Sequence, residues 1–363
     1  MEISLENKVF FIHDNDGRVS DILKKDLIKI IELIRREIKN ASVILGGSLA
    51  YGEGKYLEKK DKIEFLSDFD IFLIIPSLIE TIRSMRNPNL KNLPESFRLS
   101  TSIEFIFVWE RLLSLGLTTV AGEILVDNRR IKKVLNNLPV PRATNNLKRA
   151  FKYLLMGFTD CDKRGDYLGR ALIQGFQALL MILRKDAGYG EWNNFFSLKY
   201  DLAAIDSVKD ILGEDVCSLL KDIFKSFLDI EKKVHYRIED FFLAREFLNR
   251  IYLKLDSTFK MNDYIRYITF HLKNNKIPNP FINSTRYYLD SSMMLLDAIL
   301  DFDRFNELKL KEAEMLLNRL TGGEDIGKNL EDIFRKSVEQ LRKYDEIYLH
   351  KVKQKANNFI PIN

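Results

Sequence analysis

The alternation of apolar and polar residues predicts two short buried strands early in the chain. The apolar run at 43–45 leads into Gly46-Gly47-Ser48, and a second apolar run at 71–75 follows Ser67-Asp68-Phe69-Asp70. Short apolar runs bounded by turn residues are typical of buried strands. Because residues i and i+2 of a strand point to the same face, Asp68 and Asp70 are predicted to project together.

The flanking pattern predicts further elements around these strands. Apolar residues at helical spacing predict a helix capped by Ser20 and running to about Lys39, preceded by a solvated turn at 14–17. Residues 78–95 are predicted as a helix and a loop. The run Phe97 to Trp109 alternates as a strand that would carry Glu104.

The remainder of the chain is predicted to be helical. After Pro139 and Pro141 no proline occurs until Pro278, and residues 147–158, 167–185 and 223–255 show helical spacing. Residues 284–356 read as three more helices. We therefore predict domains at 1–141, 142–277 and 278–363, with a linker at 274–283.

Composition narrows the class of protein. The chain has 363 residues, of which 46% are hydrophobic and 30% charged, and no apolar run approaches the length of a membrane span. Its two cysteines, Cys161 and Cys217, exclude a disulfide framework and a cysteine-based zinc site. These features predict a cytoplasmic protein without a membrane partner. The cysteines and lone histidines such as His235 are expected to be structural or exposed.

Two like charges one residue apart repel unless a cation lies between them, and carboxylate oxygens suit Mg²⁺. The pattern Gly46-Gly47-Ser48 followed by Asp68-Phe69-Asp70 resembles the signature of the polymerase-beta-like nucleotidyltransferase superfamily. The resemblance covers about the first third of the chain. It implies an α+β fold: an N-terminal nucleotidyltransferase domain with a small mixed sheet and flanking helices, followed by a mainly α-helical region.

The family pattern also has a third acid on a later strand, a place that Glu104 fits and for which Glu110 is the substitute. The segment between Ser48 and Asp68 is longer than the family pattern, and these 19 residues, 49–67, are predicted to form a flap or hairpin. The chemistry that the resemblance implies is transfer of a nucleoside monophosphate from an NTP to a hydroxyl, with release of pyrophosphate.

The resemblance assigns roles to seven residues. Asp68, Asp70 and Glu104 would be the catalytic residues and the ligands of Mg²⁺, for which Mn²⁺ is the alternative. The substrate NTP, for which ATP is the expected choice, would contact Gly46, Gly47, Ser48 and Ser67. Glycines allow close backbone approach to phosphates, which accept hydrogen bonds from backbone N–H groups.

The acceptor and the role of one basic segment stay open. Residues 128–152 contain eight basic and no acidic residues: Arg129, Arg130, Lys132, Lys133, Arg142, Lys148, Arg149 and Lys152. This window could be a solvated face, line the cleft behind the triphosphate, or bind an anionic acceptor such as RNA. The acceptor could be a small molecule, a protein hydroxyl or an RNA end. The alternative functions are a catalytically silent regulator with the same fold, or an RNA-binding protein without chemistry.

Overall fold

The computed structural model describes residues 5, 8–60, 62–93, 97–114, 120–136, 139–160, 162–184, 188–229, 233–259, 284–301, 304–321 and 329–343. The chain divides into two compact units. The first unit is Met1–Pro141 with Asp186–Asp201, and the second is Arg142–Lys185 with Leu202–Asn363. The structure is mixed α+β with a small mixed sheet and mostly helical content, as predicted.

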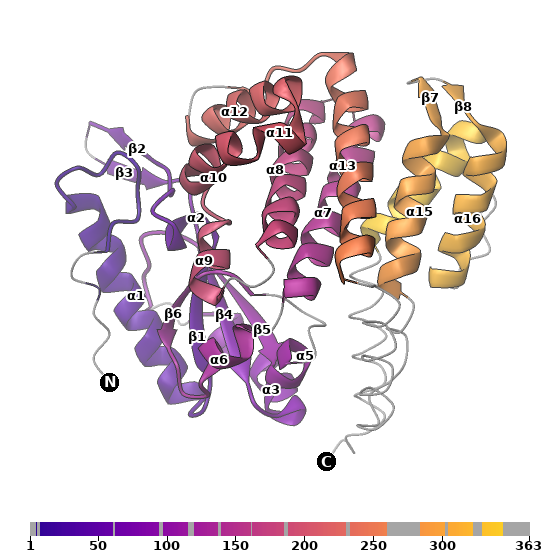
Figure 1. Cartoon of the computed structure of the whole chain (residues 1–363). Helices are drawn as coiled ribbons and strands as arrows, with labels where there is room; N and C mark the ends of the chain where they lie inside the picture. The colour runs from indigo at the N-terminus through magenta and orange to yellow at the C-terminus, as the bar shows by residue number, and fades with distance from the viewer. Residues whose placement is uncertain are drawn as a thin grey trace. The chain divides into compact units, whose positions relative to one another are not determined.

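The first unit contains a four-stranded sheet, a two-stranded sheet, the long helix α1 and several short helices (Figure 1). Its strands are β1 (Ser42–Gly46), β2 (Tyr56–Lys59), β3 (Lys62–Phe65), β4 (Phe69–Ile75), β5 (Ile103–Trp109) and β6 (Glu123–Val126). Its helices are α1 (Arg18–Glu37), α2 (Gly47–Ala50), α3 (Leu78–Met85), α4 (Pro88–Lys91), α5 (Glu110–Ser114), α6 (Ile131–Leu135) and α9 (Tyr189–Asn194).

The central sheet has four strands in the order β5-β4-β1-β6. Strand β1 runs antiparallel to both β4 and β6, whereas β4 and β5 are parallel. The end of β1 that leads into Gly47 therefore lies beside the starts of β4 and β5. The two predicted buried strands are confirmed as neighbours at the centre of this sheet.

Each face of the sheet is covered by its own hydrophobic core. On one face, β4 residues such as Ile71 and Leu73 pack with apolar residues of α1, including Leu27 and Ile30. On the other face, Ile44, Ile74 and Val108 pack with Leu113, Ile131, Leu135 and Tyr189. Alternate residues of β4 enter the two cores, as expected for a central strand. Because Asp70 alternates with Ile71, it lies on the second face.

The start of α1 differs from the sequence expectation. The helix begins at Arg18 after Gly17, and Ser20 lies inside it, where its hydroxyl accepts a hydrogen bond from the Phe10 amide at 2.9 Å. The cap comes from Asp14, whose carboxylate accepts from the amides of Val19 and Ser20. Asp14 is buried, so its predicted place in a solvated turn is wrong. A buried carboxylate satisfies helix amides that would otherwise have no partner.

The long segment between Ser48 and Asp68 forms a hairpin, as predicted. Strands β2 and β3 pair antiparallel as a separate two-stranded sheet, with Tyr56 opposite Phe65. The Phe11 ring contacts the rings of both residues, at centroid distances of 5.0 Å from Tyr56 and 5.7 Å from Phe65. The hairpin is therefore anchored at its base by an aromatic cluster.

Residues 186–201 group with the first unit, although the sequence prediction placed them in a helical domain. Hydrogen bonds explain this grouping. The Tyr189 amide donates to Asn136 Oδ1 at 2.7 Å, and the Ser197 hydroxyl donates to Glu53 Oε1 at 2.7 Å. These polar contacts join residues more than fifty positions apart, which hydrophobic periodicity does not reveal.

The second unit is built mainly from helices (Figure 1). They are α7 (Pro139–Thr159), α8 (Arg164–Leu183), α10 (Leu198–Ile205), the 3₁₀ helix η1 (Asp206–Val208), α11 (Lys209–Leu212), α12 (Glu214–Leu228), α13 (Ile238–Phe259), α15 (Ser284–Ala298), α16 (Glu307–Thr321) and a helix over 330–343. The first residues of α7, up to Pro141, and of α10, up to Asp201, belong to the first unit. A short hairpin, β7 (Ile299–Asp301) and β8 (Arg304–Phe305), separates α15 from α16.

Within this unit α8 packs against α12 and α13, and α15 packs against α16. The continuous helix predicted over 223–255 is wrong, because α12 ends at Leu228 and α13 begins at Ile238. The three helices expected after residue 284 are present in the described part.

Pro139 lies at the start of α7, where its missing N–H costs no hydrogen bond. The predicted linker at 274–283 lies outside the described residues. No helix of the described chain has both the length and the apolar content needed to cross a membrane.

Candidate functional site

Glu104, Asp70 and Gly46 form one row across three neighbouring strands. Asp70 is the register partner of Glu104 on the parallel strand β5 and of Gly46 on the antiparallel strand β1. Register partners on adjacent strands point to the same face of a sheet. The two acids therefore lie side by side, next to the glycine that ends β1.

Asp68 lies one residue before β4, and its negative charge acts on Asp70. The pKa of Asp70 is raised from 3.8 to about 6, first by burial and then by the negative charges of Asp68 and Glu104. Asp70 is half-buried, whereas Asp68 and Glu104 are exposed. The structure thus brings the three predicted acids close enough for their charges to interact.

Gly47 lies directly against the Asp70 carboxylate. Its φ of 65° is in the left-handed region, and a Cβ on this residue would lie 2.1 Å from Asp70 Oδ2. Both the backbone conformation and the contact require glycine here. The Gly46-Gly47 pair therefore lets the chain turn within van der Waals contact of an acid.

Ser48 and Ser67, both predicted to contact the nucleotide, are hydrogen-bonded to each other. The Ser48 hydroxyl donates to Ser67 Oγ at 3.1 Å, and the same Ser67 oxygen accepts from the Lys55 amide at 2.9 Å. The Thr101 hydroxyl donates to the Ser67 carbonyl at 2.7 Å. These bonds link the turn after β1, the hairpin and the approach to β4.

The donor chemistry of the site suits a hard divalent cation. Asp68, Asp70 and Glu104 offer carboxylate oxygens, and burial together with the charges of the other two acids raises the pKa of Asp70. Over the part of the chain that the structure describes, no three His, Cys, Asp or Glu side chains are arranged as a ready metal site. The three carboxylates thus match Mg²⁺ in donor chemistry, and their side chains would have to turn toward one another to hold a bound ion.

Glu110 does not belong to this site. It follows the far end of β5, whereas Glu104 stands at its start, and its carboxylate accepts from Arg129 Nε at 3.0 Å. Between the two glutamates considered from the sequence, the strand register selects Glu104.

The structure adds residues that the sequence analysis did not identify. Asn193 accepts hydrogen bonds from the Tyr51 hydroxyl at 3.1 Å and from the Gly122 amide at 2.7 Å. Glu53, assigned from the sequence to an exposed flap, is 6% exposed and accepts from the Lys199 amide. The sequence feature that could have drawn attention to Glu53 is its position between two glycines, Gly52 and Gly54. Asn193 stands in no recognisable motif.

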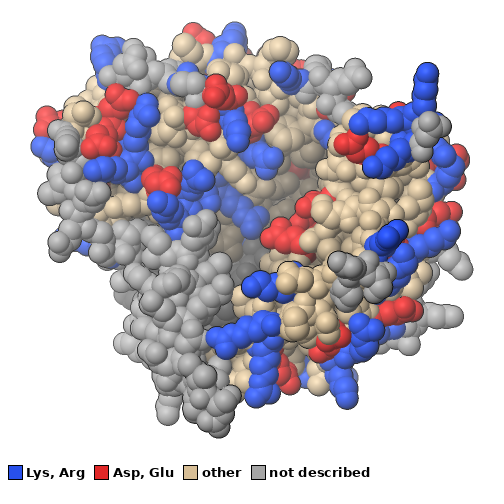
Figure 2. Space-filling model, turned by 180° about the vertical axis from the view of Figure 1, so that it is seen from behind, with Lys and Arg blue, Asp and Glu red and all other residues tan. Residues whose placement is uncertain are grey.

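The basic window 128–152 is not uniformly available to a ligand. Arg129 pairs with Glu110, Arg142 is 1% exposed, and the Lys148 ammonium lies 4.9 Å from the centre of the Tyr288 ring. On the face shown in Figure 2, basic and acidic side chains are interspersed over the described surface. Several charges of the window therefore have roles inside the fold.

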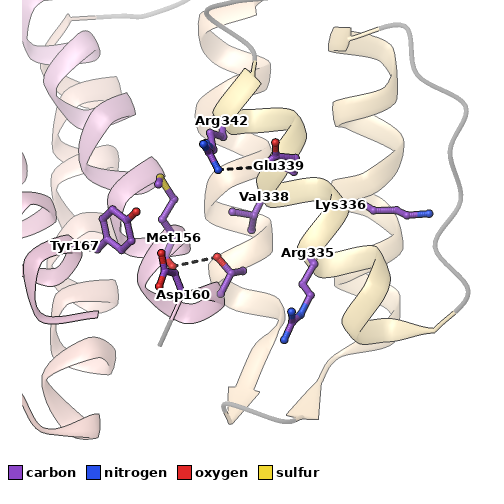
Figure 3. Close-up of a pocket in the computed structure, with 9 residues that line it drawn as sticks. Met156, Asp160, Tyr167, Arg335, Lys336, Val338, Glu339 and Arg342 are labelled. Carbon is purple, nitrogen blue, oxygen red and sulfur yellow. Dashed lines mark hydrogen bonds and ion pairs between the residues drawn. The ribbon is translucent and has the colours of Figure 1, made fainter. Parts of the chain in front are cut away.

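A pocket of about 370 Å³ lies in the second unit, formed by the end of α7, the start of α8 and the helix over 330–343. Charges of both signs line it, including Asp160, Glu339 and Arg342, and Arg342 pairs with Glu339 at 3.6 Å (Figure 3). Tyr167 and Met156 supply an apolar side, while Lys336 points away from them in Figure 3. None of the seven predicted site residues lines this pocket.

No protein-family model, no curated protein and no solved structure matches the chain.

Proposed function

We infer that the protein is a nucleotidyltransferase that moves a nucleoside monophosphate from an NTP to a hydroxyl acceptor. The observation that carries this proposal is the register of Asp70 with Glu104, next to a glycine turn that admits no side chain. Two adjacent carboxylates beside a left-handed glycine have no structural benefit, because burial and repulsion raise the pKa of Asp70. A site that binds a cation and phosphates explains the arrangement.

In this proposal Asp68, Asp70 and Glu104 would hold Mg²⁺, which when bound supplies charge neutralisation for the triphosphate and a lower pKa for the acceptor hydroxyl. The acceptor oxygen forms a bond to the α-phosphorus. The bond from that phosphorus to the α–β bridging oxygen breaks, and pyrophosphate leaves. The acceptor proton passes to the Glu104 carboxylate. The backbone at Gly46, Gly47 and Ser48, with Ser67, binds the β and γ phosphates.

The acceptor is proposed only as a class, namely a hydroxyl on a small molecule, a protein or an RNA end. We assign its recognition to the helical residues 142–277, which lie outside the part of the chain that resembles nucleotidyltransferases. RNA is the weaker choice, because Arg129, Arg142 and Lys148 of the basic window are engaged or buried.

The test is incubation of the full chain with each α-³²P-labelled NTP and Mg²⁺, with and without cellular RNA or a small-molecule extract. Transfer of label with release of pyrophosphate supports the proposal. Stabilisation by Mg²⁺ and ATP without any transfer would identify a silent regulator, because ligand binding alone raises the melting temperature. RNA binding that depends steeply on salt and survives Asp68→Asn and Asp70→Asn would identify an RNA-binding protein.

A further inference from the structure

We propose that four residues of the segment 188–201 support the proposed nucleotide site, namely Tyr189, Asn193, Ser197 and Lys199, with Asn193 as the positioning residue for the Gly46–Ser48 turn. The segment lies in the chain between helices of the second unit, but its polar side chains bond to the first unit. This inference rests on the proposed function.

Asn193 connects the two sides of the glycine turn. Its Oδ1 accepts from the Tyr51 hydroxyl, just after α2, and from the amide of Gly122, just before β6. An amide oxygen has two lone pairs, so both bonds can form at once. One side chain thereby links the chain after the turn to the strand beside β1.

Gly122 in turn lies against the start of the turn. A Cβ on Gly122 would be 1.9 Å from the Leu45 carbonyl oxygen and 3.0 Å from Gly46 Cα, at a φ of 145°. Its amide donates to Asn193, and its carbonyl accepts from the Tyr189 hydroxyl at 2.8 Å. Helix α9 therefore binds both the backbone N–H and the backbone C=O of Gly122, the residue that lies against Gly46.

A second set of bonds holds the far side of the turn. The amide of Glu53 donates to the Ser48 carbonyl at 2.9 Å, and its buried carboxylate accepts from the Ser197 hydroxyl and the Lys199 amide. The Lys199 ammonium donates to the Gly52 carbonyl at 3.1 Å. A buried carboxylate depends on such donors. The segment thus holds the chain on both sides of the residues proposed to bind phosphate.

The expected consequence is specific to nucleotide binding. A turn that is already in its bound conformation loses less entropy when phosphates bind. Losing both hydrogen bonds would loosen the turn, and we expect it to weaken ATP binding about tenfold. KM for the NTP should rise more than kcat falls, because Asn193 is placed beside the turn and contacts none of the three acids in the bonds described.

The experiment compares three variants of the full chain. Asn193→Leu removes the oxygen at similar size, Asn193→Asp keeps an oxygen acceptor, and Asn194→Leu changes the exposed neighbouring residue. We expect ATP with Mg²⁺ to bind about tenfold more weakly to Asn193→Leu, and with little change to the other two. Wild-type affinity in Asn193→Leu would overturn the inference and leave the proposed function standing.

Amide hydrogen exchange of the nucleotide-free protein tests this inference independently of the proposed function. If Asn193 holds the turn, amides of Gly122 and of residues 46–54 exchange faster in Asn193→Leu than in wild type and Asn194→Leu. Unchanged exchange overturns the inference, whether or not ATP binds. If the wild-type protein fails to bind ATP, the proposed function fails, and the exchange result alone decides whether Asn193 positions this turn.

Discussion

Asp70 and Glu104 are register partners on adjacent parallel strands, so their carboxylates project from the same face of the sheet. Burial, Asp68 and Glu104 together raise the pKa of Asp70 to about 6. A neighbouring glycine, Gly47, leaves no room between the turn and the Asp70 carboxylate. This relationship underlies the proposed chemistry.

Replacing either aspartate with asparagine should abolish transfer. Asp68→Asn and Asp70→Asn remove a negative charge and a cation ligand, and we expect a fall in pyrophosphate release on the order of a hundredfold or more. Stabilisation by Mg²⁺ and ATP, measured by thermal unfolding, should be lost as well. The control is Asp21→Asn, an exposed aspartate of α1 that pairs only with Lys24 among the ion pairs described. Full activity in Asp70→Asn would refute its role.

The stability of the metal-free protein should depend on pH through Asp70. Its folded pKa of about 6 lies above the ordinary value of 3.8, so the folded state binds this proton more tightly than the unfolded state. The free energy of unfolding should therefore fall as pH rises from about 4 to about 6 and then level off.

Thermal unfolding across this pH range, in wild type and Asp70→Asn, measures that contribution. The Asp70→Asn variant should lack this fall in stability and melt at a higher temperature than wild type at pH 8 without metal. Saturating Mg²⁺ should reduce the difference, because a cation favours the ionised carboxylate. Parallel curves for the two proteins would show that Asp70 does not titrate in this way.

Gly47→Ala should reduce both stability and activity. A side chain at a φ of 65° is strained by about 1–2 kcal/mol, and its Cβ would displace the Asp70 carboxylate. Gly17→Ala is a matched control, because Gly17 has a φ of 73° and open space around its Cβ position. Both variants should lose similar stability from backbone strain, while only Gly47→Ala should lose nucleotide binding. Equal ATP affinity in the two variants would contradict a close role for this turn.

Asp14→Ala should destabilise the first unit without touching the site. The carboxylate accepts from the amides of Val19 and Ser20, and losing this cap should cost about 1–2 kcal/mol. Burial raises the pKa of Asp14, but the hydrogen bonds from Ser20 and Val19 outweigh it and leave the pKa below its usual value.

The stabilisation by Asp14 is therefore present above about pH 4 and is lost as pH falls through its lowered pKa. Urea unfolding at pH 7 and pH 3 measures this difference. Asp21→Ala, which removes an exposed aspartate of the same helix, should cost less than half as much at pH 7. An equal cost for both variants would show that Asp14 is no more than a surface charge.

The sequence by itself determined the local parts of this protein. Apolar runs predicted β1 and β4, because buried strands of a central sheet must be apolar on both faces. Turn glycines predicted the bend at Gly46-Gly47, and helical spacing predicted most of the second unit. The spacing of Asp68 and Asp70 predicted a cation site, because two like charges one residue apart repel unless a cation lies between them, and this site stays a prediction.

Only the tertiary structure decided which distant residues meet. Strand register places Glu104 beside Asp70, whereas Glu110 is the first residue of α5, beyond the far end of β5. Asp14 became a helix cap and Glu53 a buried carboxylate through hydrogen bonds to residues outside their own turns. Asn193 joined the first unit across seventy-one positions from Gly122. Such contacts depend on side-chain hydrogen bonds between residues far apart in the sequence, and these bonds produce no periodic pattern of apolar and polar residues.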